Sequence, residues 1–255
     1  AHFGISLATK DGRVFETGDS DQLFTIQSIS KPFTYGMALE VFGQEKVSKH
    51  VGVEPSGDAF NSIELEAGTN RPFNPMVNAG AITVSSLLYQ HYGDEALEIM
   101  LKRFSDAAGR ELMVDEAVYE SEARTGHRNR AIAHLLLNFG MVDENIEPAL
   151  DLYFKQCSIL VNCKDLAVMS ATLSNLGKNP VTSKEVYEIS SVRNMLSIML
   201  TCGMYDYSGQ WAYNVGIPAK SGVSGGVTAV VNRQLGLACY SPKLDSRGNS
   251  CRGID

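Results

Sequence analysis

The sequence predicts an α+β fold, in which an antiparallel sheet is flanked by helices and joined to a helical subdomain. Short runs of alternating, β-branched or aromatic residues lie near both ends of the chain, and apolar residues recur at helical spacing between them. Terminal strands that pair around a helical insert give this class of fold. We therefore expect a sheet domain from residues 1–45 and 201–255 and a helical subdomain from residues 46–200, together one unit.

The opening strands are expected over residues 2–9 and 13–17, because Lys10-Asp11-Gly12 between them supplies a glycine for a hairpin turn. A helix should follow near Ser28, since apolar residues recur at helical spacing as far as a stop at Gly43. Pro32 is compatible with this helix only in its first turn, where a missing N–H is harmless. Ser28 is therefore predicted at or near a helix N-terminus.

The middle of the chain is predicted to be a glycine- and proline-rich ordered loop followed by helices, and the end to be strands. The loop covers residues 51–75. The helices are expected over 79–88, 95–104, 128–138, 147–154, 164–176 and 191–200, and the strands over 211–215, 225–231 and 235–240.

Composition excludes several classes of function. The 255 residues are 44% hydrophobic and 20% charged, as in ordinary globular domains, and carry a formal net charge of -7. Phosphates repel an acidic chain, so neither nucleic acid nor an anionic membrane is an expected partner. The longest apolar runs, such as residues 131–137, fall well short of the roughly 20 residues that span a bilayer.

Cysteine and histidine usage points to a reducing compartment and no metal site. The five cysteines form no Cys-x-x-Cys pair and are odd in number, and the five histidines form no His-Glu-x-x-His pattern. No charged-then-apolar signal segment opens the chain. We expect a cytoplasmic protein, or one of the mitochondrial matrix if the source is eukaryotic.

The first candidate for chemistry is Ser28-x-x-Lys31, whose two side chains share one helix face. A lysine can act as a base toward a serine hydroxyl only when it is neutral, and burial or a nearby positive charge would lower its pKa. About one such match is expected by chance in a chain of this composition. Taken alone, the motif equally fits a polar helix start with a capping serine.

The second candidate is Lys220-Ser221-Gly222, directly before a predicted strand. Lys220 could depress the pKa of Lys31 or hold an anion, and backbone N–H groups here could form half of an oxyanion hole. The alternative is a plain turn between strands. Both candidates occur in the order expected for one architecture, which strengthens each.

The chain resembles the serine-dependent glutaminase family, both bacterial enzymes and the mitochondrial kidney and liver types. The matching blocks run in order along the whole chain and are far more specific than Ser-x-x-Lys. They are Gln-Ser-Ile-Ser-Lys at 27–31, Glu-Pro-Ser-Gly at 54–57, Asn-Pro-Met-Val-Asn-Ala-Gly-Ala-Ile at 74–82, Ser-Glu-Ala-Arg-Thr-Gly-His-Arg-Asn at 121–129, Tyr-Phe-Lys-Gln-Cys-Ser at 153–158, Cys-Gly-Met-Tyr-Asp at 202–206 and Pro-Ala-Lys-Ser-Gly-Val-Ser-Gly-Gly at 218–226.

The resemblance implies a β-lactamase/transpeptidase-like fold and hydrolysis of L-glutamine to L-glutamate and ammonia, with no metal or organic cofactor. It implies that Ser28 attacks the γ-carbonyl carbon, Lys31 takes the serine proton and Tyr205 relays a proton to the leaving ammonia. The backbone N–H groups of Ser28 and Val223 would hold the oxyanion, and water would hydrolyse the acyl-enzyme. Relatives of this kind imply a homodimer or homotetramer.

The resemblance also assigns substrate binding to a set of polar residues: Gln27, Asn78, Glu122, Asn129 and Tyr153, with Tyr205 and Val223. The α-ammonium of free glutamine needs an anion such as Glu122, and its α-carboxylate needs amide donors such as Asn78 and Asn129. Without the family, Glu122 would fit a helix start and Asn129 a helix cap. The two tyrosines would fit a core with polar edges.

Three alternatives stay open at this point. A penicillin-recognising serine hydrolase would use the same Ser28, Lys31 and Lys220, although Tyr205-Asp206-Tyr207 lacks the asparagine that such enzymes carry two residues after the serine or tyrosine. A catalytically silent scaffold would be expected to lose one of the catalytic side chains. A preference for asparagine is a third, because one methylene in a pocket is worth only about 1–3 kcal/mol. The family's upstream substrate-contacting tyrosine has no counterpart in this sequence.

Overall fold

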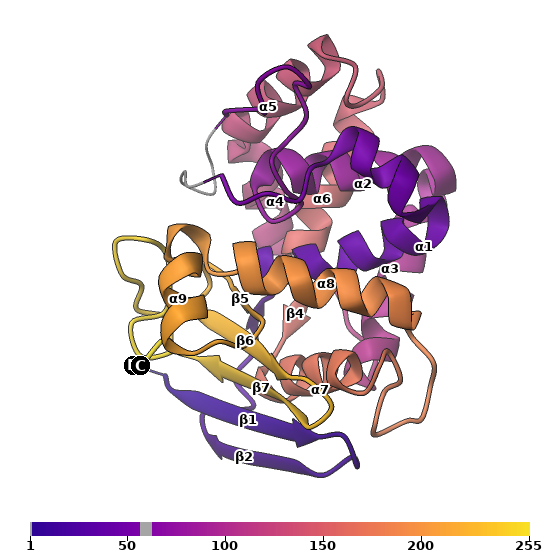
Figure 1. Ribbon diagram of the computed structural model, residues 1–255. Coiled ribbons are helices and arrows are strands. Elements are labelled where there is room, and N and C mark those ends of the chain that lie inside the picture. The colour runs from indigo at the N-terminus through magenta and orange to yellow at the C-terminus, as the bar shows by residue number, and fades with distance from the viewer. Residues whose placement is uncertain (1, 57–62) are drawn as a thin grey trace.

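The computed structural model describes residues 2–56 and 63–255, and within them the terminal strands pair as predicted. The main sheet has five strands in the order β2-β1-β7-β6-β5, with every neighbouring pair antiparallel (Figure 1). Leu7 of the first strand faces Leu237 of the last. The strands are β1 (Gly4–Thr9), β2 (Val14–Gly18), β5 (Ala219–Ser221), β6 (Gly226–Val231) and β7 (Leu235–Tyr240), and a separate pair joins β3 (Phe24–Thr25) to β4 (Leu160–Val161).

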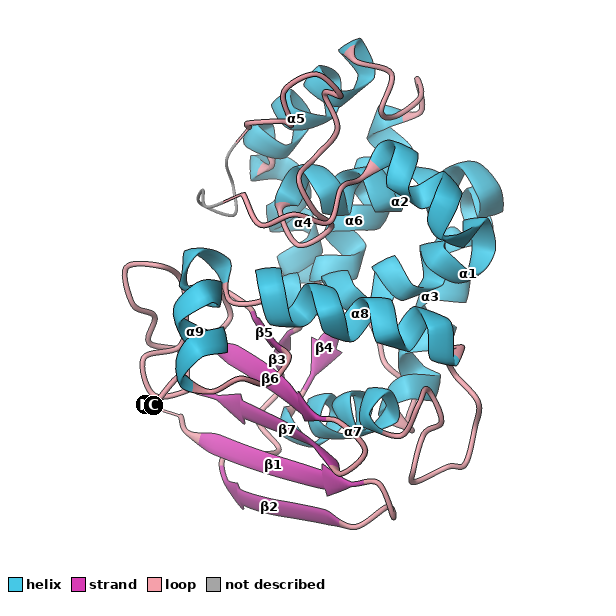
Figure 2. Ribbon diagram, in the orientation of Figure 1, coloured by secondary structure: helices cyan, strands magenta, loops and turns pink. Residues whose placement is uncertain are grey.

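Helices make up most of the rest of the described chain, and Figure 2 shows α2, α4, α5 and α6 gathered at the end of the molecule away from the sheet. The α-helices are α1 (Lys31–His50), α2 (Asn78–Tyr92), α3 (Ala96–Ala108), α4 (Glu116–Thr125), α5 (His127–Asn138), α6 (Ile146–Cys157), α7 (Cys163–Ser174), α8 (Ile189–Cys202) and α9 (Ser208–Asn214). Short 3-10 turns are η1 (Gln27–Ser30), η2 (Gly93–Glu95) and η3 (Tyr205–Tyr207). The predicted α+β class is confirmed.

One local prediction was wrong and another was incomplete. Residues 211–215 are not a strand, because residues 208–214 form α9, in which Trp211 is buried and its Nε1 donates to the Ile217 carbonyl at 2.8 Å. Gly43 interrupts α1, as predicted, because its φ of 75° and ψ of 157° are not helical; the prediction missed the second helical segment that follows this kink within Lys31–His50. A glycine at positive φ can therefore bend a helix whose two halves are held by packing.

Several elements were not predicted, among them α4 and β5, and one predicted loop is described only in part. The helix α4 is capped by Asp115, whose side chain accepts from the Val118 N–H at 3.1 Å, and β5 contains Lys220. The loop expected over 51–75 contains no helix or strand among its described residues, and 57–62 lie outside them.

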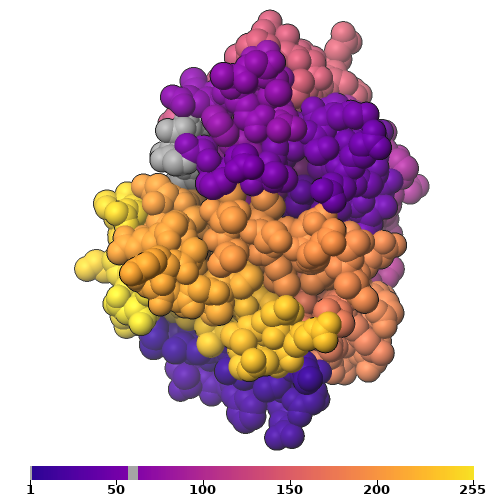
Figure 3. Space-filling view, in the orientation of Figure 1, coloured from indigo at the N-terminus to yellow at the C-terminus, as the bar shows by residue number. Residues whose placement is uncertain are grey.

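The helix α7 covers the sheet closely. A Cβ on Gly236 of β7 would lie 2.2 Å from the Ala171 nitrogen and 2.4 Å from the Ala167 carbonyl oxygen, so only glycine allows this contact. The space-filling view shows the orange C-terminal segments filling the space between the indigo N-terminal strands and the purple segments above (Figure 3). The division of the chain at residues 45 and 200 stays a prediction.

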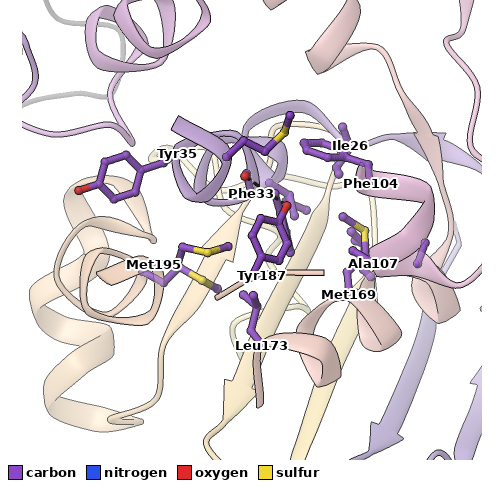
Figure 4. Packing of buried hydrophobic residues seen from close by; sticks show 14 of the residues in the cluster. Ile26, Phe33, Tyr35, Phe104, Ala107, Met169, Leu173, Tyr187 and Met195 are labelled. Atoms are coloured by element: carbon purple, nitrogen blue, oxygen red, sulfur yellow. Dashed lines mark hydrogen bonds between the residues drawn. The ribbon is translucent and has the colours of Figure 1, made fainter. Parts of the chain in front are cut away.

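The main core packs against the start of α1. Phe33 is fully buried, two residues after Lys31, and its ring meets the Phe104 ring edge-on at 5.9 Å between centroids. The Tyr187 hydroxyl donates to the Phe33 carbonyl at 3.2 Å (Figure 4). This packing fixes the first turn of α1, and with it the position of Lys31.

The ends of the described chain lie side by side, where Arg252 Nη2 donates to the His2 carbonyl at 2.8 Å. Within the described residues, no helix combines the length and apolar character needed to cross a bilayer.

Replacing Phe104 by alanine tests the packing beneath α1. We expect Phe104→Ala to lower the free energy of unfolding by about 3–5 kcal/mol, because the change removes a fully buried ring and leaves a cavity. Urea unfolding measures it. Phe15→Ala is the control: that ring is 57% exposed, so its loss should change stability by less than about 0.5 kcal/mol. Equal effects of the two changes would contradict this account of the core.

Candidate active site

Ser28 lies in the 3-10 turn η1, directly before α1. Gln27, the first residue of this turn, has φ 49°, a left-handed conformation that is uncommon for a residue with a side chain. Lys31 is the first residue of α1, and Pro32 falls in its first turn as predicted. Ser28 and Lys31 are both buried. The predicted position of Ser28 near a helix N-terminus is therefore confirmed, with the serine one short turn ahead of the α-helix.

The Lys31 amine donates to two fixed acceptors. Its Nζ lies 3.0 Å from the Met76 carbonyl oxygen and 2.7 Å from Asn78 Oδ1. Complete burial lowers the pKa of Lys31 to about 8. A neutral amine has two N–H groups and one lone pair. The two acceptors take up both N–H groups and leave the lone pair free to accept a proton.

Lys220 lies on β5, with its side chain buried beside the same site. Its Nζ donates to the carbonyls of Gly203 at 3.0 Å and Ser221 at 2.6 Å. Burial first, and the charge of Lys31 second, hold the pKa of Lys220 well below its ordinary value. The alternative of a plain turn at Lys220-Ser221-Gly222 is wrong for its first two residues, which are in a strand. The two lysines are thus close enough to repel each other when both are charged.

Tyr205 connects Lys220 to Ser28. Lys220 Nζ lies 4.4 Å from the centre of the Tyr205 ring. Burial raises the pKa of the Tyr205 hydroxyl, and a hydrogen bond with the Ser28 side chain partly opposes that rise. Tyr205 has φ 56° and borders a cavity of about 160 Å³. The serine hydroxyl therefore lies beside a protonated phenol.

Asn78 is the centre of a second hydrogen-bonded group. Its Oδ1 accepts from Lys31 and also from the Tyr153 hydroxyl at 3.3 Å, and its Nδ2 donates to Asn129 Oδ1 at 3.2 Å. Tyr153 is buried on α6, and burial above all raises its pKa. One connected group thus joins the lysine to three of the residues predicted to bind substrate.

Glu122 is close to this group. Its charge contributes to raising the pKa of Tyr153, and it also raises that of Cys157, for which burial is the main cause. Glu122 lies in the last turn of α4, so the alternative of a helix-start carboxylate is wrong. Asn129 lies in the first turn of α5 and does not cap it. The loop Gly126 between these helices packs on the Phe154 ring of α6, where a Cβ would lie 2.4 Å from the ring.

The turn after β5 packs against η1. A Cβ on Gly222 would lie 3.1 Å from the Ile29 side chain and 3.2 Å from the Ile26 carbonyl oxygen. Val223 follows Gly222 in this turn, and its N–H donates no hydrogen bond within residues 2–56 and 63–255; the same holds for the N–H of Ser28. The N–H groups of Ser28 and Val223 therefore have no acceptor within these residues, and the two segments that contain them are in contact.

Two buried residues on α6 were missed at the sequence level. Gln156 and Cys157 are three and four residues after Tyr153, so all three lie on the helix face toward the site. The Cys157 thiol interacts with Tyr153 and lies near Lys31, and burial raises its pKa to about 12. Helical spacing from Tyr153 was the available signal. Gln27 places its side-chain Nε2 3.2 Å from Thr25 Oγ1, at the base of η1.

Comparison with known proteins matches the family model described as Glutaminase to residues 1–255. The chain belongs to the glutaminase family. A glutaminase from Trichormus variabilis is 57% identical over 252 residues, which cover 99% of this chain and 75% of that protein. A solved structure described as a probable glutaminase superposes with a TM-score of 0.96 at 41% identity, covering 99% of this chain and 82% of that one.

A further solved relative, Mglu, is described in its glutamate form; it is 45% identical, has a TM-score of 0.94, and is covered over 59% of its length by 99% of this chain. The glutaminase is therefore an amidohydrolase that acts on glutamine, with the fold of its relatives. The penicillin-recognising alternative is not favoured, because relatives named glutaminase match over nearly the whole chain.

Proposed function

We propose that this glutaminase hydrolyses L-glutamine through an acyl-enzyme on Ser28, with Lys31 as the base. The observation that carries the proposal is the buried Lys31 amine, whose pKa is lowered to about 8 and whose two N–H groups already have acceptors. Such an amine has its lone pair available at mildly alkaline pH. A serine hydroxyl on the adjoining turn is the group that it would deprotonate.

In acylation, the Ser28 proton passes to Lys31 Nζ while Oγ bonds to the γ-carbonyl carbon of glutamine. The resulting oxyanion would accept hydrogen bonds from the unused N–H groups of Ser28 and Val223. The carbon–nitrogen bond then breaks. Tyr205, whose hydroxyl interacts with the Ser28 side chain, gives its proton to the departing nitrogen and regains one from Lys31, so that ammonia leaves neutral.

In deacylation, water attacks the acyl carbon and gives a proton to Lys31, and the bond to Ser28 breaks as Oγ takes that proton back. Glutamate leaves and the starting state is restored. Side chains of this chain and water carry every proton in the cycle.

Recognition of the amino-acid end of glutamine is proposed for Gln27, Asn78, Glu122, Asn129 and Tyr153. Glu122 supplies the negative charge that an α-ammonium needs, and the amides of Asn78 and Asn129 and the Tyr153 hydroxyl supply donors for an α-carboxylate. The glutamate form described for Mglu supports this class of product. Buried polar groups left unpaired would disfavour ligands that lack either charge.

Two further proposals concern the oligomeric state and the cellular location of the enzyme. We propose a homodimer or homotetramer, which rests on the family alone. A cytoplasmic location is supported by the five cysteines, all of them free, four of them buried.

Ser28→Ala is the direct test of the nucleophile. We expect kcat for L-glutamine to fall at least about 10⁴-fold, because the acyl-enzyme cannot form. Tm should stay close to that of the wild type, since only one oxygen is removed. Coupled detection of glutamate measures the rate, and substantial turnover by a folded Ser28→Ala protein would refute the assignment.

The base role of Lys31 predicts a pH dependence. Because the neutral amine is the active form, kcat/KM should rise with pH through a midpoint near 8 and then level off. About a tenth of the molecules would be active at pH 7. A profile that falls over pH 7 to 9 would contradict the sign of this proposal.

Glu122→Ala tests the ammonium site. We expect KM for L-glutamine to rise about 10- to 100-fold, since a hydrogen-bonded charge is lost while Ser28 and Lys31 remain. Glu120→Ala is the matched control, because Glu120 is exposed on the same helix. Unchanged kcat and KM in Glu122→Ala would remove Glu122 from the site.

A further inference from the structure

A one-way chain of buried hydrogen bonds lies behind the nucleophile turn. Ser85 Oγ donates to Gln156 Oε1 at 3.3 Å, Gln156 Nε2 donates to Ser30 Oγ at 2.9 Å, and Ser30 Oγ donates to the Gln27 carbonyl at 2.6 Å. Ser85, Gln156 and Ser30 are each 0% exposed. None of the three belongs to the proposed catalytic or substrate-binding set.

This row of hydrogen bonds ends on Gln27, the most constrained residue of the turn. Gln27 adopts φ 49°, and a non-glycine residue keeps such a conformation only when its surroundings hold it there. The Gln27–Ser28 peptide determines where the Ser28 N–H and side chain point. A bond to the Gln27 carbonyl therefore acts on the orientation of the nucleophile and of one proposed oxyanion donor.

The hydrogen-bonding needs of Ser30 and Ser85 explain why residue 156 is a glutamine. Ser30 gives its single proton to Gln27, so its oxygen needs a donor from the side chain behind it. Ser85 gives its proton in turn, so that side chain must also accept. An amide on a long stem provides both functions; a carboxylate or an apolar side chain leaves one partner unpaired in a fully buried place.

The same row of hydrogen bonds also joins the helices and the turn that contain the site residues. Ser85 lies on α2, the helix that begins with Asn78, and Gln156 lies on α6, one turn after Tyr153. Ser30 closes η1, the turn that carries Ser28. The same hydrogen bonds thus tie the proposed substrate-binding helices to the proposed nucleophile.

We propose that Gln156 is a positioning residue, which acts through Ser30 to hold the Gln27 carbonyl and so to orient Ser28. This inference rests on the proposed nucleophile. It assigns Gln156 no contact with substrate, and it makes Ser30 and Gln156 parts of one device whose effects on turnover overlap.

The experiment compares Gln156→Met, Ser30→Ala and the double variant. Methionine at position 156 keeps the length of the side chain but has no N–H donor. Ser30→Ala removes a single oxygen. Ser30→Ala therefore serves as the test if Gln156→Met does not fold. We expect kcat for L-glutamine to fall about 10- to 100-fold in each, with KM within about threefold of the wild type. The pH midpoint should stay where Lys31 sets it.

The kcat of the double variant decides whether the two residues act together. If Ser30 and Gln156 act as one unit, kcat of the double variant should lie within about threefold of the worse single variant, because either change already interrupts the row of hydrogen bonds that ends on the Gln27 carbonyl. Losses that multiply would overturn the proposal, since the residues would then act separately. Single variants with kcat within threefold of the wild type would overturn it as well.

Asn179→Leu is the matched control for the general cost of losing a buried amide. Asn179 is 0% exposed, and its Nδ2 donates to the Asp106 carbonyl at 2.8 Å, in a turn outside the site. We expect a lower Tm and an unchanged kcat. An equal kcat loss in Asn179→Leu would overturn the proposal, whereas turnover by Ser28→Ala would instead refute the nucleophile assignment.

Discussion

The rest of the site depends on one buried amine. Removing Lys31 from water makes its charged form costly, and this lowers its pKa into the range where an enzyme can use it as a base. The carbonyl of Met76 and the side chain of Asn78 then fix the direction of its N–H groups. Asn78 is the first residue of α2 and Met76 lies two residues before it, so the geometry of the base depends on how α2 meets α1.

Packing converts that contact into a rigid arrangement. The Phe33 ring is buried against Phe104, and the Tyr187 hydroxyl holds the Phe33 carbonyl, so the first turn of α1 has little freedom. Gly222 allows the turn after β5 to approach η1 at van der Waals distance. The sheet thereby supports the proposed oxyanion donors, while the helices support the proposed recognition of the amino acid.

Buried polar groups carry much of this organisation, and they do so because they are paired. Lys220 has two carbonyl acceptors, Asn78 uses both ends of its amide, and Gln156 both accepts and donates. An unpaired group in the same place would cost about 1–3 kcal/mol. Mutual dependence of this kind makes a site precise, and it also explains why residues that touch no substrate are expected to affect turnover.

Sequence alone determined the α+β class, the pairing of terminal strands, the start of α1 near Ser28 and membership of the glutaminase family, because periodicity, turn residues and long motifs are local signals. Only the tertiary structure decided that 211–214 are helical, that a helical segment follows Gly43, and that Gln156 supports η1. Residues 126 positions apart, such as Ser30 and Gln156, meet through packing. Their spacing along the sequence does not predict this contact.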